Sequence, residues 1–366
     1  MAAALYAFVE LAPVIPRTTG DPLRVGFVAL VDCAPLVVAK ELGIFRDFGL
    51  DVILLRQPGW ASVRDKVVTG ELDASQAVSG LPFAISHGLG GAQCACLTAL
   101  LLNTHGDAIT VSNRLWEAGA RTARELAAEL RRGSLGGPLV FGVVHPHSSH
   151  NFLLHDWLRS ARLVPGEDVQ IVIVPPPLMA RNLAAGNLDG FCVGEPWNTA
   201  SISGGNGHCI ATSAELCPHH PEKNLLVTKA FAERRSGDHQ RLIGALLEAC
   251  AYCDRSENHP EIARLLALPG YVNVSEEILL QSLCCEHVAT PKLRASKLRV
   301  HHFSGGDTNR PTGQRANWIL QQMNRCGVAA PSNTRGLPAA GDIFRADIYD
   351  EVVRSLGALR QPALAV

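Results

Sequence analysis

The feature that most constrains the fold of this chain is a short phrase that occurs twice. Residues 63–78 read VRDKVVTGELDASQAV, and residues 179–193 read MARNLAAGNLDGFCV. Each copy is a helix-like stretch that ends at a glycine, as helix C-termini often do, and continues through Leu-Asp into a strand-like run. The copies lie about 115 residues apart, which exceeds the period of solenoid repeats. The phrase therefore predicts two similar α/β lobes with a ligand cleft between them, although such joints also occur in any α/β protein.

The composition agrees with two globular lobes and argues against a nucleic-acid-binding protein. The chain has 366 residues, of which 47% are hydrophobic and 18% are charged, and its net charge is −1. A nucleic-acid-binding protein would carry a basic patch or a high isoelectric point. Aromatic residues make up only 5%, which also argues against a surface on which single-stranded bases stack.

The N-terminal segment predicts no export signal. No Lys or Arg precedes Arg17, and Glu10 interrupts the only apolar run of this segment, whereas a secretory signal needs a positive start and an uninterrupted apolar core. The sequence also contains no uncharged apolar run long enough to span a membrane. The eleven cysteines are odd in number and scattered among apolar residues, as buried free thiols are. We therefore expect a cytoplasmic protein that does not bind membranes.

Strand-like and helix-like segments alternate along the chain, which predicts a mostly parallel sheet in each lobe. A helix is expected shortly after the second strand, with Ser62 as its N-terminal cap. After Pro221 the pattern becomes helical. We assign the lobes and the tail by residue number: the first lobe is discontinuous and takes 22–110 and 211–330, the second lobe takes 111–210, and a C-terminal tail with one short helix takes 331–366.

Two loops at the ends of strands contain candidate ligand-binding residues. Trp60 lies between a strand and a helix, at the edge where open α/β sheets bind ligands, so a ligand-facing ring is favoured over a packing role. His145, His147 and His150 precede a helix whose free N–H groups and positive dipole suit an anion. We expect one of these histidines to face the cleft and two to be exposed. A zinc site is the alternative, but it lacks the cysteines and the orienting carboxylate that such sites usually have.

Three other places carry polar groups. Glu195 ends a strand and is either a hinge or orienting group or a cap of the next helix. Lys223 would be the natural counter-charge to an anion if it lies in the cleft. Cys284 and Cys285 are adjacent on a predicted helix, where packing thiols are more common than a metal or redox site. Because no common catalytic motif is present, we predict a binding protein without a cofactor or metal rather than an enzyme.

Several of these segments together resemble the nitrate/bicarbonate-binding receptors of ABC transporters. The resemblance rests on residues 31–80 and on the phrases HGDAITVSN, SSHNFLLHDWL and LAAGNLDGFCVGEPWN, and it extends from Leu23 to Trp318. It implies an α/β, two-lobed periplasmic-binding-protein-like fold of type II, which closes on a ligand in the cleft between its lobes.

The resemblance also implies the residues that hold the ligand. In the nitrate receptors a Trp, a His and a Lys hold the planar anion, and by motif these fall on Trp60, His150 and Lys223. A flat ring can stack on nitrate while charged and N–H donors reach its oxygens. Asp107, Gly80 and Gly194 complete the set of expected ligand-binding residues.

One position departs from the pattern of the nitrate receptors. Asp107 stands where that family has a side-chain amide, and an anionic Asp107 would repel nitrate unless it is turned away or protonated. Bicarbonate receptors use a carboxylate and a bound calcium in their cleft, so bicarbonate stays open as the ligand.

Without an export signal, the chain resembles the cytoplasmic branch of the family, the NasS-type nitrate/nitrite sensors. There the ligand-free sensor sequesters a NasT-type RNA-binding antiterminator, and nitrate releases it. We therefore expect nitrate or nitrite as ligand, an antiterminator as partner, and no direct contact with nucleic acid. One alternative is an exported ABC-transporter receptor for nitrate or bicarbonate. The other is an enzyme similar to thiamine-pyrimidine synthases, which would need a Lys for a Schiff base and a phosphate-sized loop.

Overall fold

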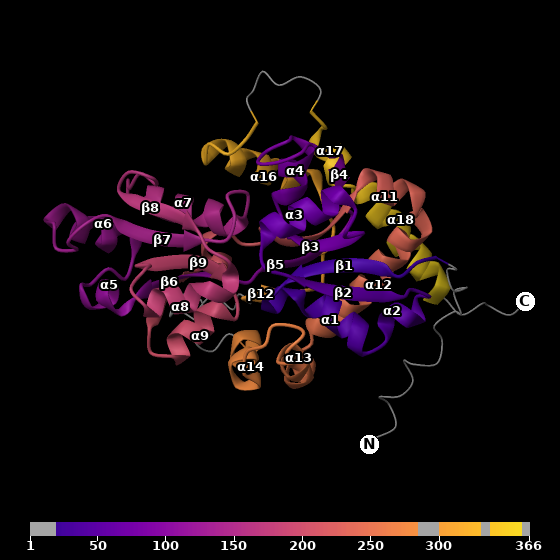
Figure 1. Cartoon of the computed structure of the whole chain (residues 1–366), viewed down its shortest axis with the longest axis horizontal. Coiled ribbons are helices and arrows are strands. Elements are labelled where there is room, and N and C mark those ends of the chain that lie inside the picture. Colours follow the sequence, from indigo (N-terminus) through magenta and orange to yellow (C-terminus); the bar gives the residue numbers. More distant parts are fainter. Residues whose placement is uncertain (1–19, 285–299, 331–336, 361–366) are drawn as a thin grey trace, which may run out of the picture.

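The structure is a computed structural model that describes residues 20–284, 300–330 and 337–360. Within these residues the chain forms two lobes side by side, each built around its own β-sheet (Figure 1). We call the seven-stranded sheet with the helices that cover it the first lobe, and the five-stranded sheet with its helices the second lobe. The two-lobed α/β fold expected from the sequence is therefore confirmed.

The first lobe is formed by the N-terminal and C-terminal parts of the described chain. Its sheet has the order β12-β5-β11-β3-β1-β2, with β4 paired to β11. Its strands are β1 (Leu23–Val28), β2 (Val52–Gln57), β3 (Ala74–Val78), β4 (Cys96–Leu97), β5 (Leu101–His105), β11 (Pro221–Thr228) and β12 (His301–His302). Its helices are η1 (Val31–Cys33), α1 (Ala34–Glu41), α2 (Ile44–Asp47), α3 (Trp60–Thr69), α4 (Leu81–Ser86), α11 (Lys229–Arg234), α12 (Ser236–Cys253), η3 (Ser256–Asn258), α13 (His259–Leu266), α14 (Glu276–Cys284), α16 (Gly313–Arg325), α17 (Ala340–Ile343) and α18 (Ala346–Arg360).

The second lobe is one continuous stretch of chain. Its sheet has the order β10-β6-β9-β7-β8. Its strands are β6 (Asp107–Ser112), β7 (Leu139–Val143), β8 (Val169–Ile173), β9 (Gly190–Gly194) and β10 (Gly207–Thr212). Its helices are α5 (Asn113–Glu117), α6 (Ala123–Arg132), α7 (Ser149–Ser160), η2 (Pro176–Leu178), α8 (Met179–Ala184), α9 (Trp197–Ser203) and α10 (Ser213–Leu216).

Both sheets are mixed, which corrects the expectation of mostly parallel sheets. The strands β2, β1 and β3 run parallel, as do β8, β7 and β9. However, β11 runs antiparallel to β3 and β5, and β6 runs antiparallel to β9 and β10. These antiparallel strands lie where the chain passes from one lobe to the other, so the alternating pattern of each lobe does not extend to them.

The chain passes between the sheets through two neighbouring segments. It leaves the first sheet at His105, enters the second at Asp107, and returns between Thr212 and Pro221. Both segments contain left-handed backbone, with φ of 63° at His105 and 65° at His219. The His219 N–H donates to His105 Nε2 at 2.5 Å, so the two crossing segments are tied to each other.

The repeated Gly-x-Leu-Asp phrase has the same structure in both lobes: it ends a helix and leads into a strand. Gly70 and Gly186 have left-handed φ angles of 77° and 74° and end their helices, a conformation in which glycine is unstrained. The aspartate that follows then pairs with the neighbouring strand. The Asp73 carboxylate accepts from the Arg24 backbone N–H at 2.8 Å.

The second copy repeats this arrangement. The Asp189 carboxylate accepts from the Val140 backbone N–H at 2.9 Å. Each aspartate also pairs with an arginine, Arg24 for the first copy and Arg114 for the second. The echo in the sequence therefore reflects a repeated strand-pairing motif.

Two local expectations were wrong. Helix α3 begins at Trp60, and Ser62 lies inside it and donates to Gln57 Oε1 at 2.9 Å instead of capping the helix. The C-terminal stretch holds two helices in its described part, and α18 has 15 residues. It packs on α12, and an ion pair of 2.7 Å joins Arg310 to Asp350. The division of the chain into domains by residue number stays a prediction.

No helix in the described part of the chain has both the length and the apolar character needed to cross a lipid bilayer.

Candidate functional site

Seven polar or aromatic side chains meet where the two lobes touch, and each of them exposes at most 2% of its surface. We call this group the interlobe cluster. The first lobe contributes Asp32 from η1, Trp60 from the start of α3, His220 from just before β11, and Glu222 and Lys223 from β11, and the second lobe contributes Asp107 from the start of β6 and His150 from the first turn of α7. Buried charges of this number are costly unless they pair with one another.

Lys223 lies among carboxylates from its own lobe. Its Nζ atom is 2.8 Å from Asp32 Oδ2 and 3.3 Å from His150 Nε2, and it donates to Glu222 Oε1. Burial alone would lower the pKa of Lys223, but Asp32 and Glu222 outweigh this effect and raise it. Lys223 therefore carries a full positive charge at neutral pH, and a ligand anion would compete with these two carboxylates for it.

His150 reaches across the interface from the second lobe. It lies in the first turn of α7, where the Ser148 side chain caps the helix by accepting from the Asn151 N–H at 3.2 Å. The Nε2 atom of His150 is 2.9 Å from Glu222 Oε1 and 3.1 Å from Asp107 Oδ1. Its Nδ1 atom has no hydrogen-bond partner among the described residues. His150 thus links carboxylates that belong to different lobes.

Trp60 forms an aromatic wall of the interlobe cluster. The Lys223 Nζ atom lies 5.6 Å from the centre of a Trp60 ring, which is within the range of a cation–π contact. The structure therefore brings together Trp60, His150 and Lys223, the three residues that the sequence predicted as a set. Their role in ligand binding stays a prediction.

Asp107 is not turned away from the cluster. Its Oδ1 atom faces His150, and its Oδ2 atom lies 3.4 Å from Ser149 Oγ and 3.9 Å from His220 Nε2. Burial, followed by the nearby Glu222 charge, raises the pKa of Asp107. Burial likewise raises the pKa of Asp32 to about 6, although Lys223 opposes the shift.

The two predicted glycines lie at different places. A Cβ atom at Gly194 would lie 3.4 Å from Asp107 Oδ1 and 3.5 Å from Asp32 Oδ2, so Gly194 borders the interlobe cluster. A Cβ atom at Gly80 would lie only 2.3 Å from the carbonyl oxygen of His147. Gly80 therefore marks a tight contact between the lobes.

The expected exposure of two histidines was wrong. His145 and His147 each expose 8% of their surface. The His145 Nδ1 atom accepts from the His147 N–H at 3.2 Å, and His147 Nε2 lies 2.9 Å from the carbonyl oxygen of Val328. The first lobe and the segment after α16 cover this loop, and a local sequence pattern does not reveal contacts of that kind.

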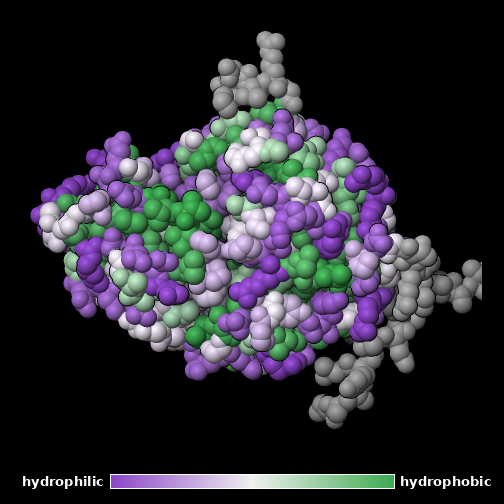
Figure 2. Space-filling view, in the orientation of Figure 1, coloured by the Kyte–Doolittle hydropathy of each residue, from purple (hydrophilic) through white to green (hydrophobic). Residues whose placement is uncertain are grey.

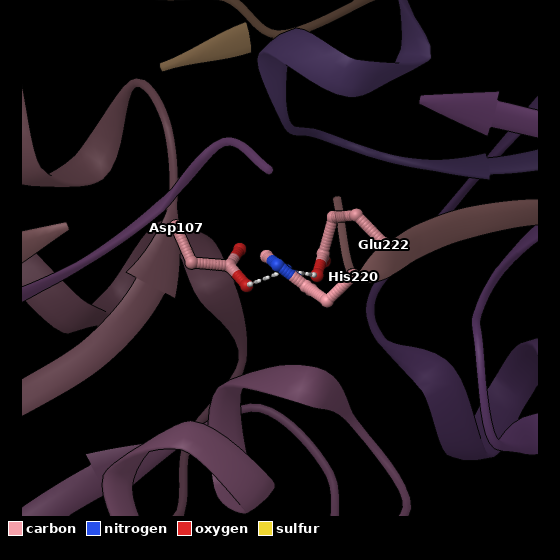
Figure 3. Close-up of side chains that lie close together, drawn as sticks. All are labelled: Asp107, His220 and Glu222. Atoms are coloured by element: carbon pink, nitrogen blue, oxygen red, sulfur yellow. Dashed lines mark ion pairs between the residues drawn. The ribbon is translucent and has the colours of Figure 1, made fainter. Parts of the chain in front are cut away.

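Sequence reasoning missed Asp32, His220 and Glu222. Asp107, His220 and Glu222 each offer a ligand atom, and these atoms lie within 4.8 Å of one another (Figure 3). The contacts of Glu222 with Lys223 and His150 outweigh its burial and hold its pKa well below the usual value. A signal was present in the sequence for Asp32, because it is a charged residue in a segment that is otherwise apolar.

The remaining predicted residues lie outside the interlobe cluster. The Glu195 Oε2 atom accepts from the Thr199 N–H at 3.1 Å, as a carboxylate that caps α9 would, and burial raises the pKa of Glu195 to about 7. Cys284 is the last residue of α14 and is exposed, which corrects its expected role as a packing thiol. Cys285 lies outside the described residues.

The sequence matches one family and several curated proteins. The profile of the NMT1-like family matches residues 18–267. Nitrate import ATP-binding protein NrtC of Synechocystis sp. is 38% identical over 339 residues, which cover 92% of this chain and 50% of that protein. Bicarbonate transport ATP-binding protein CmpC of the same organism is 36% identical over 344 residues, with the same two coverages. The chain thus spans about half the length of these relatives.

Matches that cover more of the relative are less similar in sequence. Nitrate/nitrite binding protein NrtA of Nostoc sp. is 26% identical over 353 residues, covering 93% of this chain and 79% of that protein. The crystal structure of the periplasmic nitrate-binding protein NrtA from Synechocystis superposes with a TM-score of 0.84 at 24% identity, covering 95% of this chain and 92% of the other. At this identity the superposition supports the periplasmic-binding-protein-like fold alone.

Proposed function

The chain belongs to the NMT1-like family, and from this premise we propose that it binds a small planar oxoanion, nitrate or nitrite, between its lobes. The observation that carries the proposal is the convergence of three unlike groups in a buried place. Lys223 supplies a positive charge, His150 supplies a nitrogen 3.3 Å from it, and Trp60 supplies an aromatic wall. The names of NrtC and NrtA support nitrate or nitrite as the first ligands to test.

In this proposal the anion replaces protein carboxylates as the partner of Lys223. Asp32 and Glu222 contact the Lys223 ammonium in the present structure. The lobes must separate for an anion to enter, because every group of the interlobe cluster is buried. The opening of the lobes would let these carboxylates move or become hydrated, and closure would then place the anion against groups from both lobes.

We further propose that the protein is a cytoplasmic sensor whose anion-bound state controls a NasT-type RNA-binding antiterminator. The resemblance to NasS-type sensors supports this proposal. So do buried cysteines such as Cys33, Cys250 and Cys253, which form no disulfide, because free thiols suit a reducing compartment. The transport names of the relatives support an ABC-transporter receptor equally well. They favour a binding protein over an enzyme.

Calorimetric titration with nitrate, nitrite and bicarbonate is the direct test of ligand binding. Lys223→Ala should weaken nitrate binding roughly thirty- to a hundredfold, since loss of a charge-assisted bond in a dry site costs about 2–3 kcal/mol. Lys229→Ala is the control, because its side chain is 58% exposed and its ammonium pairs with Glu233 at 3.8 Å, outside the interlobe cluster. Unchanged affinity in a folded Lys223 variant would refute the site.

A thermal melt of each variant should accompany these titrations, because Lys223→Ala leaves buried carboxylates without their partner. His150→Ala provides a second variant, with a smaller expected loss. If bicarbonate binds and nitrate does not, the site assignment stands and the ligand assignment is wrong.

The sensor and transport proposals can be separated in the native host. A sensor should fractionate with the cytosol and copurify with a small response regulator in the absence of nitrate. A receptor should appear in an exported fraction and associate with a permease.

A further inference from the structure

We propose that Asp107, His220 and Glu222 form a binding site for a divalent transition-metal cation of the Zn²⁺ type, which bridges the two lobes. The proposed ion site adjoins the proposed nitrate site, because Glu222 also contacts Lys223 and His150, and it differs from the expectation of a metal-free protein. Asp107 belongs to the second lobe, whereas His220 and Glu222 belong to the strand β11 side of the first lobe.

The donor atoms have the spacing of ligands around one small ion. His220 Nε2 lies 3.4 Å from Glu222 Oε2 and 3.9 Å from Asp107 Oδ2, and the Ser149 hydroxyl donates a hydrogen bond to Glu222 Oε2 beside them. Tetrahedral zinc with bonds of 2.0–2.1 Å holds its ligand atoms about 3.4 Å apart. In Figure 3 the two carboxylates approach the His220 ring, one from each lobe.

The orientation of His220 points to a cation. Its Nδ1 atom lies 2.9 Å from the carbonyl oxygen of Cys217, so Nδ1–H donates there and Nε2 turns toward the carboxylates. Histidines that bind metals almost always donate their other ring N–H in this way. Nε2 forms no hydrogen bond within the described residues, although His220 is only 2% exposed.

A proton on Nε2 would not account for these distances. A charge-assisted N–H···O bond between imidazolium and carboxylate closes to about 2.7–2.9 Å. The observed separations of 3.4 and 3.9 Å are longer, and they are shared between two carboxylates. The space between His220 Nε2 and the two carboxylates therefore suits a metal ion bound by both carboxylates better than it suits a shared proton.

The charge of the surroundings also favours a divalent cation. Three buried carboxylates, Asp32, Asp107 and Glu222, face one ammonium, that of Lys223. When ionised, these four groups sum to two negative charges, which one divalent ion would neutralise. An uncompensated charge in a dry interior is costly.

The unused carboxylate oxygens would orient the ligands. Asp107 Oδ1 and Glu222 Oε1 both contact His150 Nε2, and Glu222 Oε1 also accepts from Lys223. Each carboxylate thus offers its second oxygen to the proposed ion. Outer contacts of this kind fix ligand geometry in known metal sites. Since imidazole suits Zn²⁺, Co²⁺ and Ni²⁺, and Ca²⁺ prefers six to eight oxygens, we expect Zn²⁺ to bind more tightly than Ca²⁺.

The test uses the full-length protein after treatment with EDTA and removal of the chelator. Titration with ZnCl₂ against a chromophoric chelator should give one tight site per chain that His220→Gln weakens by more than about tenfold, since even outer-shell changes cost ten- to a hundredfold. His239→Gln is the control, because His239 is equally buried, with 1% exposure, but lies in α12. It should bind Zn²⁺ as the parent does.

CoCl₂ then identifies the ligands by absorption. Visible bands of four-coordinate Co²⁺ without a near-ultraviolet thiolate band would support the site, and a thiolate band would assign the metal to cysteines and overturn it. Asp107→Asn is the second variant if His220→Gln fails to fold, and it should lose the same bands. Zn²⁺ affinity that is unchanged in His220→Gln or Asp107→Asn, no Zn²⁺ site at all, or a preference for CaCl₂ would each refute the proposal.

Discussion

Gly80→Ala should hinder closure of the lobes without damaging either lobe. Gly80 precedes α4 with φ of −84° and ψ of −9°, which alanine adopts without strain. The obstacle lies in the other lobe, since the added Cβ would lie 2.3 Å from the His147 carbonyl oxygen and 3.2 Å from the His147 Cβ. An ordinary contact begins at 3.4 Å, so the lobes must separate by about 1 Å at this point, as an overpacked contact requires.

The free-energy cost of the Gly80→Ala contact follows from the rigidity of the loop around His147. His147 is held through its Nε2 atom by Val328 and through its N–H by His145, so the carbonyl has little freedom to withdraw. Overpacking of this kind costs about 1–3 kcal/mol, and the contact is absent when the lobes are open. The whole cost therefore falls on the closed form, which corresponds to a shift of about 5- to 150-fold toward the open form.

Small-angle X-ray scattering and calorimetry would measure this shift. The ligand-free variant should have a larger radius of gyration than the parent protein. Nitrate affinity should fall by the same factor by which the population of the closed form falls. Gly237→Ala is the control, because a Cβ there meets nothing within 4 Å. If Gly80→Ala matches the control in both scattering and affinity, the contact between Gly80 and His147 does not limit closure.

Three further variants test the electrostatics and the output. In the metal-free protein, Asp107→Gln should tighten nitrate binding by removing a like charge, and calorimetry showing weaker binding would contradict this. Trp60→Ala should bind the antiterminator normally but fail to release it, because nitrate would no longer favour the closed form; a pull-down with and without nitrate checks this, and normal release would count against Trp60. Burial raises the pKa of Glu195 to about 7 from 4.5, so the folded state keeps a proton that the unfolded chain has lost. The free energy of unfolding should therefore fall as pH rises from about 4.5 to 7, by on the order of 3 kcal/mol. Urea unfolding of Glu195→Gln should lack this loss, and an equal pH dependence in both proteins would exclude Glu195 as its source.

The sequence predicted the core of the candidate site better than its electrostatics. Trp60 and His150 were recognised because each follows a strand end, and Lys223 because it is a cation beside an apolar strand-like run. The resemblance to the nitrate receptors then joined the three. The carboxylates Asp32 and Glu222 were missed, although Glu222 is next to Lys223 in sequence, because only the folding of the first lobe buries all three side chains together. A sequence position shows that a charged residue lies in an apolar segment, but not which charge it meets.

The fold shows the same division between local and long-range information. The repeated Gly-x-Leu-Asp phrase predicted two related lobes because its effect is local, through a helix end and one strand pairing. The mixed sheets were not predicted, because the direction of β6 and β11 depends on how the chain crosses between lobes. Burial of His145 and His147 likewise depends on segments that are distant in sequence.

Figure 2 shows patches of apolar side chains among polar ones on the visible face of both lobes. The interlobe cluster, in contrast, adjoins those segments, because Asp107 begins the chain beyond the first crossing and His220 ends the second. The molecule therefore has the proportions of a lever with a short and a long arm. A small displacement beside the crossing segments becomes a much larger displacement at the outer rims of the lobes. A partner that binds the outer rims of both lobes would respond to small displacements of atoms near the crossing segments. By the same mechanics, a modest force at the rims would act as a larger force at the interlobe cluster.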